Sequence, residues 1–116
     1  MSSIELEQLR RLQAETCKTF GNPTRLLILE KVWDGKVTYR ELLEATGLDK
    51  VTLSQNTSFM RRKGILKGYR EGGNLVFEVA NHKVLKAFQL MREVLLDRIR
   101  EENRLVKAGA RRSGTE

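Results

Sequence analysis

Residues 38–64 decide the fold, and they read TYRELLEATGLDKVTLSQNTSFMRRKG. Thr38 and Glu41 have the spacing of a capping box, so a short helix is expected to begin here and to run to about residue 45. Gly47 ends that helix, and Asp49 is placed to cap a second helix that runs to about residue 63. Two short helices joined by a glycine-containing turn predict a helix-turn-helix.

The second of these helices has an unusual outward face. Its inward positions are expected to be Leu53, Thr57 and Met60, with Phe59 beside them. The opposite face carries Lys50, Thr52, Ser54, Gln55, Asn56 and Ser58. Ser, Thr, Gln and Asn are mediocre helix formers, but their side chains hydrogen-bond to base edges and phosphates. The pattern therefore favours a DNA-recognition helix over a merely solvated polar face, with Gln55 and Asn56 as candidates for base contacts.

The positive charge is concentrated in the same region. The chain of 116 residues has 22 basic and 15 acidic residues, a net charge of +7. Six basic residues and no acidic one lie between positions 50 and 70, which leaves the rest of the chain nearly neutral: Lys50, Arg61, Arg62, Lys63, Lys67 and Arg70. A solvated basic face is the alternative, but a compact basic stretch beside a helix-turn-helix indicates a polyanionic partner. Lys50, Arg62 and Arg70 are the candidates for phosphate contacts.

A β-hairpin is expected directly after the helix-turn-helix. Residues 65–70 and 75–79 have strand composition and flank the turn sequence 71–74. The second strand alternates, with Leu75, Phe77 and Val79 expected on the buried face. A hairpin in this place is a wing. Arg70 and Asn74 flank its tip, where they could reach a phosphate or the minor groove.

Two helices are expected to flank this core, at residues 4–20 and about 81–106. A third helix is expected at residues 23–33, with Asn22 as its N-cap and Pro23 at its first position. The last helix has a long apolar seam at positions 84, 88, 91, 95 and 99, too long for a small winged domain to cover. Pairing with the first and last helices of a second copy would cover it. The fold class expected is mainly α (α+β): a winged helix-turn-helix of about five helices and a two-stranded wing, homodimeric through the first and last helices. Residues 1–108 form the DNA-binding and dimerisation domain, and residues 109–116 a flexible tail.

Composition excludes several classes of protein. One cysteine rules out an intrachain disulfide, and one cysteine plus one histidine do not make an ordinary zinc cage. The first residues lack the basic and then apolar run of a signal peptide, and no stretch approaches 18 apolar residues. A cytoplasmic protein with no membrane partner is expected.

Three segments in this order resemble the ArsR-type (ArsR/SmtB-like) winged helix-turn-helix regulators. The first is FGNPTRLLIL at residues 20–29, the second runs from Gly47-Leu48 through Ser54-Gln55 to MRRKGIL at 60–66, and the third is REGGNLVF at 70–77. The resemblance covers roughly residues 12–100. It implies a homodimer that represses transcription by occupying an operator and leaves when a signal binds, with Thr52, Ser54, Gln55 and Asn56 where the recognition helix meets the major groove. Asn56 stands where the family often has histidine, which suggests altered base preference. Thr57 stands where the family usually has leucine, which puts a hydroxyl near the core.

The effector is unknown. Many ArsR-type regulators sense metals through cysteines on the third helix or acidic and histidine residues on the last, but here residues 39–44 hold no thiol and His82 has no second histidine. We therefore expect no metal and no cofactor; a shared site across a dimer from His82 with Asp97 or Glu101 lacks support. Cys17 is expected to be a small buried apolar residue near the dimer interface. The alternative is a redox or persulfide sensor thiol.

The function expected is a sequence-specific DNA-binding regulator, a repressor acting as a homodimer on an inverted repeat. The sequence contains no phosphate loop or nucleophile elbow, so an enzyme is not expected. A winged helix that contacts RNA is disfavoured because A-form RNA denies side chains its major groove. The remaining alternatives are an architectural protein that binds DNA without sequence preference, and a redox- or sulfur-responsive repressor that uses Cys17.

Overall fold

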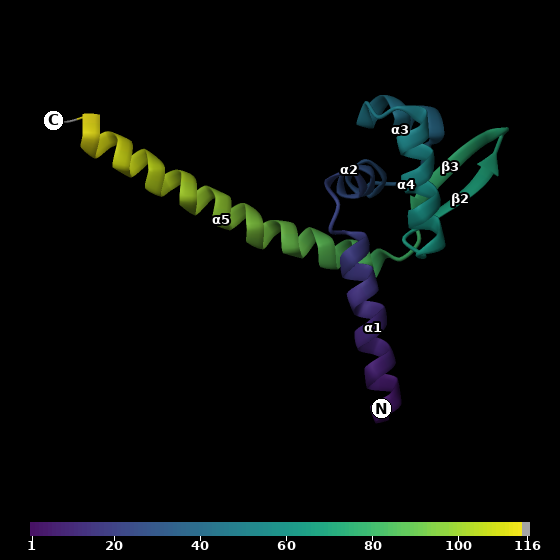
Figure 1. Ribbon diagram of the computed structural model, residues 1–116. Coiled ribbons are helices and arrows are strands. Elements are labelled where there is room, and N and C mark those ends of the chain that lie inside the picture. The colour runs from purple at the N-terminus through teal and green to yellow at the C-terminus, as the bar shows by residue number, and fades with distance from the viewer. Residues whose placement is uncertain (115–116) are drawn as a thin grey trace. The chain divides into compact units, whose positions relative to one another are not determined.

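A computed structural model describes residues 1–114, with side chains placed through residue 110. The chain divides into two compact units, residues 1–82 and the part that begins at Lys83. The described elements of the first unit, most of them labelled in Figure 1, are α1 (Ser3–Thr19), α2 (Pro23–Val32), β1 (Val37–Thr38), α3 (Tyr39–Thr46), α4 (Lys50–Arg62), β2 (Leu66–Glu71) and β3 (Asn74–Val79). The second unit is the long helix α5 (His82–Gly114), whose first residue closes the first unit.

The start of α2 follows from two residues, as the sequence predicts. Asn22 is the N-cap, and its side-chain oxygen accepts hydrogen bonds from the backbone amides of Thr24, at 2.8 Å, and Arg25, at 3.4 Å. Pro23 occupies the first helical position, where a missing N–H leaves nothing unsatisfied. The next helices begin with caps of the same kind, so local sequence sets the positions of α2, α3 and α4.

The sheet has three antiparallel strands in the order β1-β3-β2, one more than the hairpin predicted. The added strand, β1, is only two residues long and pairs Val37 with Phe77. Two residues are too short for an alternating pattern, and Thr38 also caps α3, so the sequence carried no strand signal here. On the central strand β3, Val76 is buried as well as Phe77, against the simple alternation expected.

The core of the first unit is small and apolar. Seven side chains from α1–α4 and β3 are almost completely buried: Thr19, Ile28, Val32, Leu42, Leu53, Met60 and Phe77. Of the residues of α4 predicted to face inward, Leu53, Thr57 and Met60 are buried, whereas Phe59 is only half-buried. The Thr57 hydroxyl donates to the carbonyl oxygen of Leu53 at 2.8 Å, so the family departure at this position leaves no unsatisfied polar group in the core.

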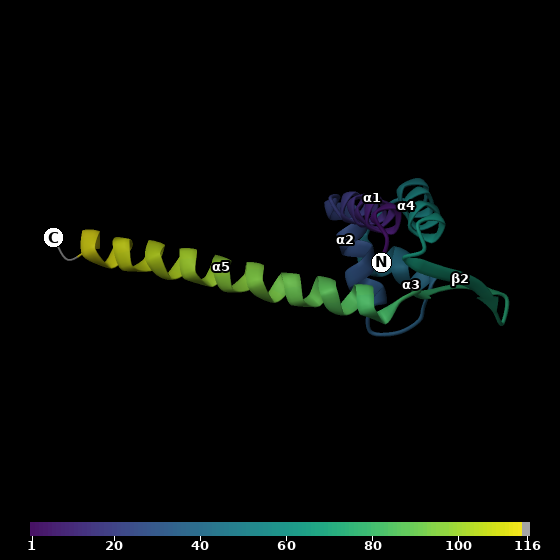
Figure 2. The same cartoon turned by 90° about the horizontal axis from the view of Figure 1, so that it is seen from below.

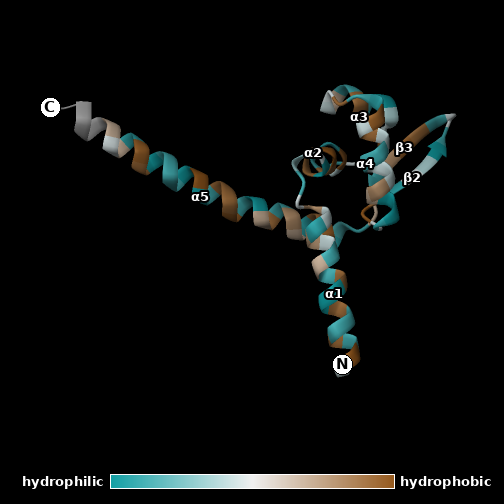
Figure 3. Ribbon diagram, in the orientation of Figure 1, coloured by the Kyte–Doolittle hydropathy of each residue, from teal (hydrophilic) through white to brown (hydrophobic). Residues whose placement is uncertain are grey.

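The helix α1 exposes nearly all of its side chains within the first unit. Only Thr19 is buried, and an apolar row formed by Leu6, Leu9 and Leu12 is exposed, as is Ile4. Apolar and polar residues alternate around this helix in Figure 3. Cys17 is exposed, so the expectation of a buried apolar cysteine is wrong for the single chain.

The helix α5 continues past the expected end near Val106 and reaches Gly114. Two alanines flank Gly109 in this segment, and alanine is the best helix former, which accounts for the extra turns. Eight large apolar side chains of α5 are exposed: Leu90, Met91, Val94, Leu95, Leu96, Ile99, Leu105 and Val106. Part of the predicted flexible tail, including the side chains of Arg111 and Arg112, lies outside the described residues. None of the described helices is both long and apolar enough to cross a membrane.

Candidate nucleic-acid interface

The helix-turn-helix is held by a cap at each helix start and a left-handed glycine between them. The hydroxyl of Thr38 accepts a hydrogen bond from the Glu41 amide at 3.1 Å, which begins α3. Gly47 ends α3 with φ at 68°, and its amide donates to the Leu43 carbonyl at 3.0 Å. Because residues with a Cβ rarely adopt this φ, glycine fixes the angle at which the chain enters α4.

Asp49 caps the N-terminus of α4 through both carboxylate oxygens. One accepts from the backbone amide of Thr52 at 2.8 Å, and the other accepts from the Thr52 hydroxyl, also at 2.8 Å. The amide of Thr52 is the largest cause that holds the pKa of Asp49 below its ordinary value, followed by the hydroxyl. The hydroxyl of Thr52, one of the predicted DNA contacts, is therefore engaged in the cap.

Four exposed side chains form a single stripe along α4: Val51, Ser54, Gln55 and Ser58. Their spacing of three, one and three residues places them on one face of a helix, and we call this set the α4 stripe. Val51 is 65% exposed and was missed by the sequence analysis, which looked for polar residues only. The helical spacing of the three polar members would have found it. An exposed valine among hydrogen-bonding groups can contact the methyl group of thymine.

Asn56 lies on the flank of α4 and is only half-exposed. Its side-chain amide donates to the carbonyl of Thr52 at 2.8 Å, within the same helix. The structure thus brings Ser54 and Gln55 together on the stripe, whereas Thr52 and Asn56 are tied to the helix itself. Gln55 is the predicted base-contacting residue whose side chain makes no hydrogen bond among the described residues.

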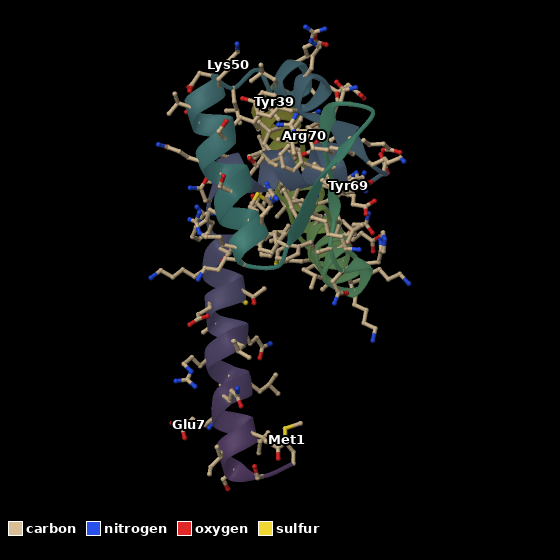
Figure 4. All side chains as sticks on the ribbon, turned by 90° about the vertical axis from the view of Figure 1, so that its right-hand side faces the viewer. Met1, Glu7, Tyr39, Lys50, Tyr69 and Arg70 are labelled. Atoms are coloured by element: carbon tan, nitrogen blue, oxygen red, sulfur yellow. The ribbon has the colours of Figure 1, made fainter. Side chains whose placement is uncertain are left out.

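Tyr39 extends this surface from α3. Its hydroxyl lies 3.2 Å from the Ser54 hydroxyl and donates to the carbonyl of Lys50 at 3.4 Å. Figure 4 shows Tyr39 beside Lys50 at the N-terminal end of α4. The sequence analysis assigned Tyr39 no role, although a tyrosine at the first position of the first helix of a helix-turn-helix was a usable signal.

The C-terminus of α4 passes directly into the wing. Gly64 is left-handed, with φ at 72°. The Gly64 amide donates to the carbonyl of Arg61 at 3.0 Å, and the Ile65 amide donates to the carbonyl of Met60 at 2.9 Å. These are the two hydrogen bonds of a Schellman motif. Arg61 then crosses onto β2, where its guanidinium donates to the Gly68 carbonyl at 3.4 Å. A Cβ on Gly68 would lie 2.8 Å from this guanidinium, so the close approach depends on glycine.

The wing ends in a two-residue turn. Gly72 and Gly73 both have positive φ, 56° and 82°, as a type I′ hairpin turn requires. Arg70 donates to the Gly73 carbonyl at 3.3 Å, which holds the arginine at the tip. The tip projects beyond α2, α3 and α4 in both Figure 1 and Figure 2. Asn74 is exposed at the same end, as predicted.

An ion pair joins the wing to the loop before β1. The ammonium of Lys36 lies 2.9 Å from the Glu71 carboxylate. Hydrogen bonding to Glu71, and then its charge, raise the pKa of Lys36. Since both side chains are more than half exposed, this pair contributes little to stability.

The six basic residues of the 50–70 stretch are all exposed. None of them forms an ion pair with a carboxylate among the residues the structure describes. Lys50 lies at the start of α4, Arg61 and Arg62 end it, and Lys67 and Arg70 lie on β2. Their charges are therefore available to a polyanion on the same part of the unit that presents the α4 stripe.

The described residues contain no cluster of three or more histidine, cysteine or acidic residues suited to a metal ion. His82, the first residue of α5, is exposed. A metal site that combines His82 with Asp97 or Glu101 would need a second copy of the chain, and this possibility stays untested.

Comparison with curated proteins identifies transcriptional regulators. The uncharacterised helix-turn-helix-type transcriptional regulator Rv0081 of Mycobacterium tuberculosis strain H37Rv is 32% identical over 93 residues, which are 79% of this chain and 82% of that protein. The helix-turn-helix-type regulator NmtR of the same strain is 29% identical over 66 residues, 57% of this chain and 55% of that protein. No protein-family model matches the chain.

Solved structures agree with these relatives. The crystal structure of M. tuberculosis Rv0081 superposes with a TM-score of 0.73 at 29% identity, over 81% of this chain and 95% of that one. The solution structure of a homodimeric winged helix-turn-helix DNA-binding domain, Mb0332 of Mycobacterium bovis, gives a TM-score of 0.75 at 25% identity, over 85% and 91% of the two chains. That domain is described as a possible ArsR-family regulator.

Proposed function

Because this chain belongs to the ArsR-type family of winged helix-turn-helix DNA-binding transcriptional regulators, we propose that it is a repressor that binds an inverted-repeat operator as a homodimer. One recognition helix, α4, enters the major groove from each subunit, and the two grooves lie about 34 Å apart on one face of the duplex. Gln55 and Ser54 bond to base edges, Lys50, Arg62 and Arg70 contact phosphates, and the wing tip with Asn74 lies along the backbone or the minor groove.

The observation that carries this proposal is the α4 stripe. Val51, Ser54, Gln55 and Ser58 are exposed along one face of a helix whose other face is core, so the stripe can enter a groove without disturbing the fold. An amide, two hydroxyls and an isopropyl group can together read donors, acceptors and a thymine methyl. The surrounding basic side chains supply the affinity that does not depend on sequence.

The dimer is supported by apolar surface that a single chain leaves uncovered. Within the first unit α1 exposes Leu6, Leu9 and Leu12, at 42–53% of each side chain's surface. Within the second, α5 exposes its apolar row as far as Val106. Water-exposed rows of this length are unfavourable in a monomer, and a second copy of the same helices covers them.

Selection of bound fragments from a random duplex pool, followed by titration of two variants, tests the proposal. Gln55→Ala is expected to lose about 1–3 kcal/mol on the selected operator and little on random duplex. Arg62→Ala serves as the matched control: it should weaken binding to all duplexes alike and reduce the slope of affinity against salt concentration by about one.

Two outcomes would contradict the proposal. If no sequence is enriched and operator and random duplex bind equally, the architectural alternative is correct, since a specific regulator prefers its site by about a thousandfold or more. If Gln55→Ala weakens random duplex as much as the operator, Gln55 contacts the backbone and not a base.

The redox- or sulfur-responsive alternative keeps one supporting observation, the exposure of Cys17 in α1. A sensor thiol must be reached by its oxidant. Alkylation of the native dimer and of the denatured chain should then proceed at comparable rates, and oxidant or polysulfide should release the operator from wild type but not from Cys17→Ser. Full protection of the thiol in the native dimer would exclude this role.

A further inference from the structure

A hollow of about 300 Å³ lies in the first unit where the C-termini of α1 and α4 meet the N-terminus of α2. Six residues line it: Glu15, Lys18, Thr19, Arg25, Phe59 and Lys63. Three are cationic and one is acidic. The hollow is separate from the α4 stripe, because its α4 residues, Phe59 and Lys63, lie in the last turn and at the C-cap of that helix.

Two of the cations that line this hollow, Arg25 and Lys63, lie over one aromatic ring, together with the neighbouring Arg62. The guanidinium of Arg25 lies 4.6 Å from the centre of the Phe59 ring, the Lys63 ammonium 5.7 Å and the Arg62 guanidinium 5.8 Å. Arg25 is fixed further, because it donates to the carbonyls of Thr19 and Lys18 at the end of α1. The attraction of each cation to the ring thus draws together like charges that otherwise repel one another.

These charges are not neutralised within the chain. Lys18, Arg25, Arg62 and Lys63 make no ion pair with a carboxylate in the described part of the structure. Glu15 lines the hollow, but it is one negative charge against three positive ones. Two of the cations, Lys18 and Lys63, are exposed and therefore accessible to a ligand.

We propose that this hollow binds a small multivalent oxyanion, of the diphosphate class, between Lys18 on α1, Arg25 on α2 and Lys63 at the end of α4. The volume admits a group of that size, and the guanidinium held by α1 together with two exposed ammonium groups offers charge-assisted hydrogen bonds from three elements. The ring of Phe59 already faces cations, so the site recognises charge and not an aromatic ligand.

Binding there would oppose DNA binding, a consequence that rests on the proposed function. An anion beside Arg62 and Lys63 cancels part of the positive potential at the end of the recognition helix. By linkage, DNA must then lower the affinity of the anion by the same factor. The site would act as an effector site that uses neither metal nor thiol.

The test uses inorganic pyrophosphate as the probe, at constant ionic strength, and isotope-labelled full-length protein. Backbone amide shifts at Lys18, Thr19, Arg25 and Lys63 should change saturably. Lys18→Ala/Lys63→Ala should weaken binding about tenfold or more, since it removes two charged donors. Lys18→Arg/Lys63→Arg keeps both charges and should retain the affinity for pyrophosphate. Lys31→Ala/Lys86→Ala removes the same charge at exposed positions elsewhere and should leave this affinity unchanged.

Shifts spread over all basic residues, or an unchanged affinity in Lys18→Ala/Lys63→Ala, would overturn the proposal. Shifts at these amides produced by duplex DNA but not by pyrophosphate would show that the hollow contacts backbone phosphate, and would overturn it as well. Affinity for duplex DNA measured without pyrophosphate reports on the proposed function separately. Loss of that affinity on adding pyrophosphate should occur in wild type and not in Lys18→Ala/Lys63→Ala.

Discussion

The hydroxyl of Tyr39 lies 3.2 Å from the hydroxyl of Ser54 and joins the first helix of the helix-turn-helix to the exposed stripe of the second. A serine on a helix surface ordinarily samples several rotamers. Here a neighbour from α3 favours the rotamer that faces Tyr39, and the same tyrosine also bonds to the backbone of α4 at Lys50. The stripe is therefore partly ordered before DNA arrives.

A double-mutant cycle between these two residues should show coupling. Tyr39→Phe and Ser54→Ala each remove one hydroxyl and keep the rest of the side chain. Each is expected to weaken operator binding by about 0.5–1.5 kcal/mol, and the double variant by less than the sum of the two. Binding titrations on the selected operator measure this, with circular dichroism to confirm that the fold is kept. Strict additivity would show that the two hydroxyls act independently and that the contact between them does not contribute to recognition.

Val51 is expected to contact a thymine methyl. Replacing thymine by uracil at one operator position removes that methyl and should cost wild type about 0.8 kcal/mol, the value of one buried methyl-sized group. On the operator that carries uracil at that position, Val51→Ala should bind almost as tightly as wild type. Scanning uracil through the operator locates the contact. If no position distinguishes thymine from uracil, Val51 does not lie in the groove.

Asp49 should make stability depend on pH in acid. Because its folded pKa is lowered by the bonds from Thr52, the stabilisation is fully present above the unfolded value, about 3.9. It is lost as the pH falls through the folded pKa. Asp49→Asn keeps a capping oxygen but does not titrate there. The Tm of wild type should therefore fall relative to the Tm of this variant as the pH is lowered from about pH 5 to pH 2. A constant difference would mean that the cap does not control this helix.

The apolar row of α1 should be needed for the dimer. Leu9→Glu places a charge in that row and is expected to give a species near the monomer mass of 13.4 kDa with much weaker operator binding. Ala14→Glu adds the same carboxylate on the opposite face of α1 and should leave the dimer intact. Light scattering after gel filtration separates the two. A monomeric wild type, or dimeric Leu9→Glu, would show that this row is not the interface.

Most of the fold could be predicted from the sequence because local signals define it. Asn22, Thr38 and Asp49 cap helices at the predicted positions, and Gly47 and Gly64 end them. Elements that depend on tertiary pairing could not be predicted in this way. Strand β1 exists only because β3 lies beside it, and the burial of both Val76 and Phe77 on neighbouring positions of β3 departs from the period of two that the sequence suggests.

The candidate site was predicted in outline and not in detail. Helical spacing shows which side of α4 faces outward, and residue type suggested that Gln55 is available for contact. Which side chains are already engaged depends on three-dimensional geometry: Thr52 bonds to Asp49, and Asn56 to the backbone of its own helix. Tyr39 is brought to Ser54 by the turn between the helices, and no pattern along a single helix contains that contact.

The Schellman motif at Gly64 leaves no hinge between the recognition helix and the wing, because Ile65 bonds back to Met60 and also accepts from Ala80. In the complex proposed above, a rigid junction fixes how many base pairs separate the groove that α4 enters from the backbone that the hairpin touches. Changes of residue type on the α4 stripe can therefore alter which bases are preferred while the length of DNA that each subunit protects stays the same. New operators can evolve by substitution at the stripe alone, with half-site spacing conserved.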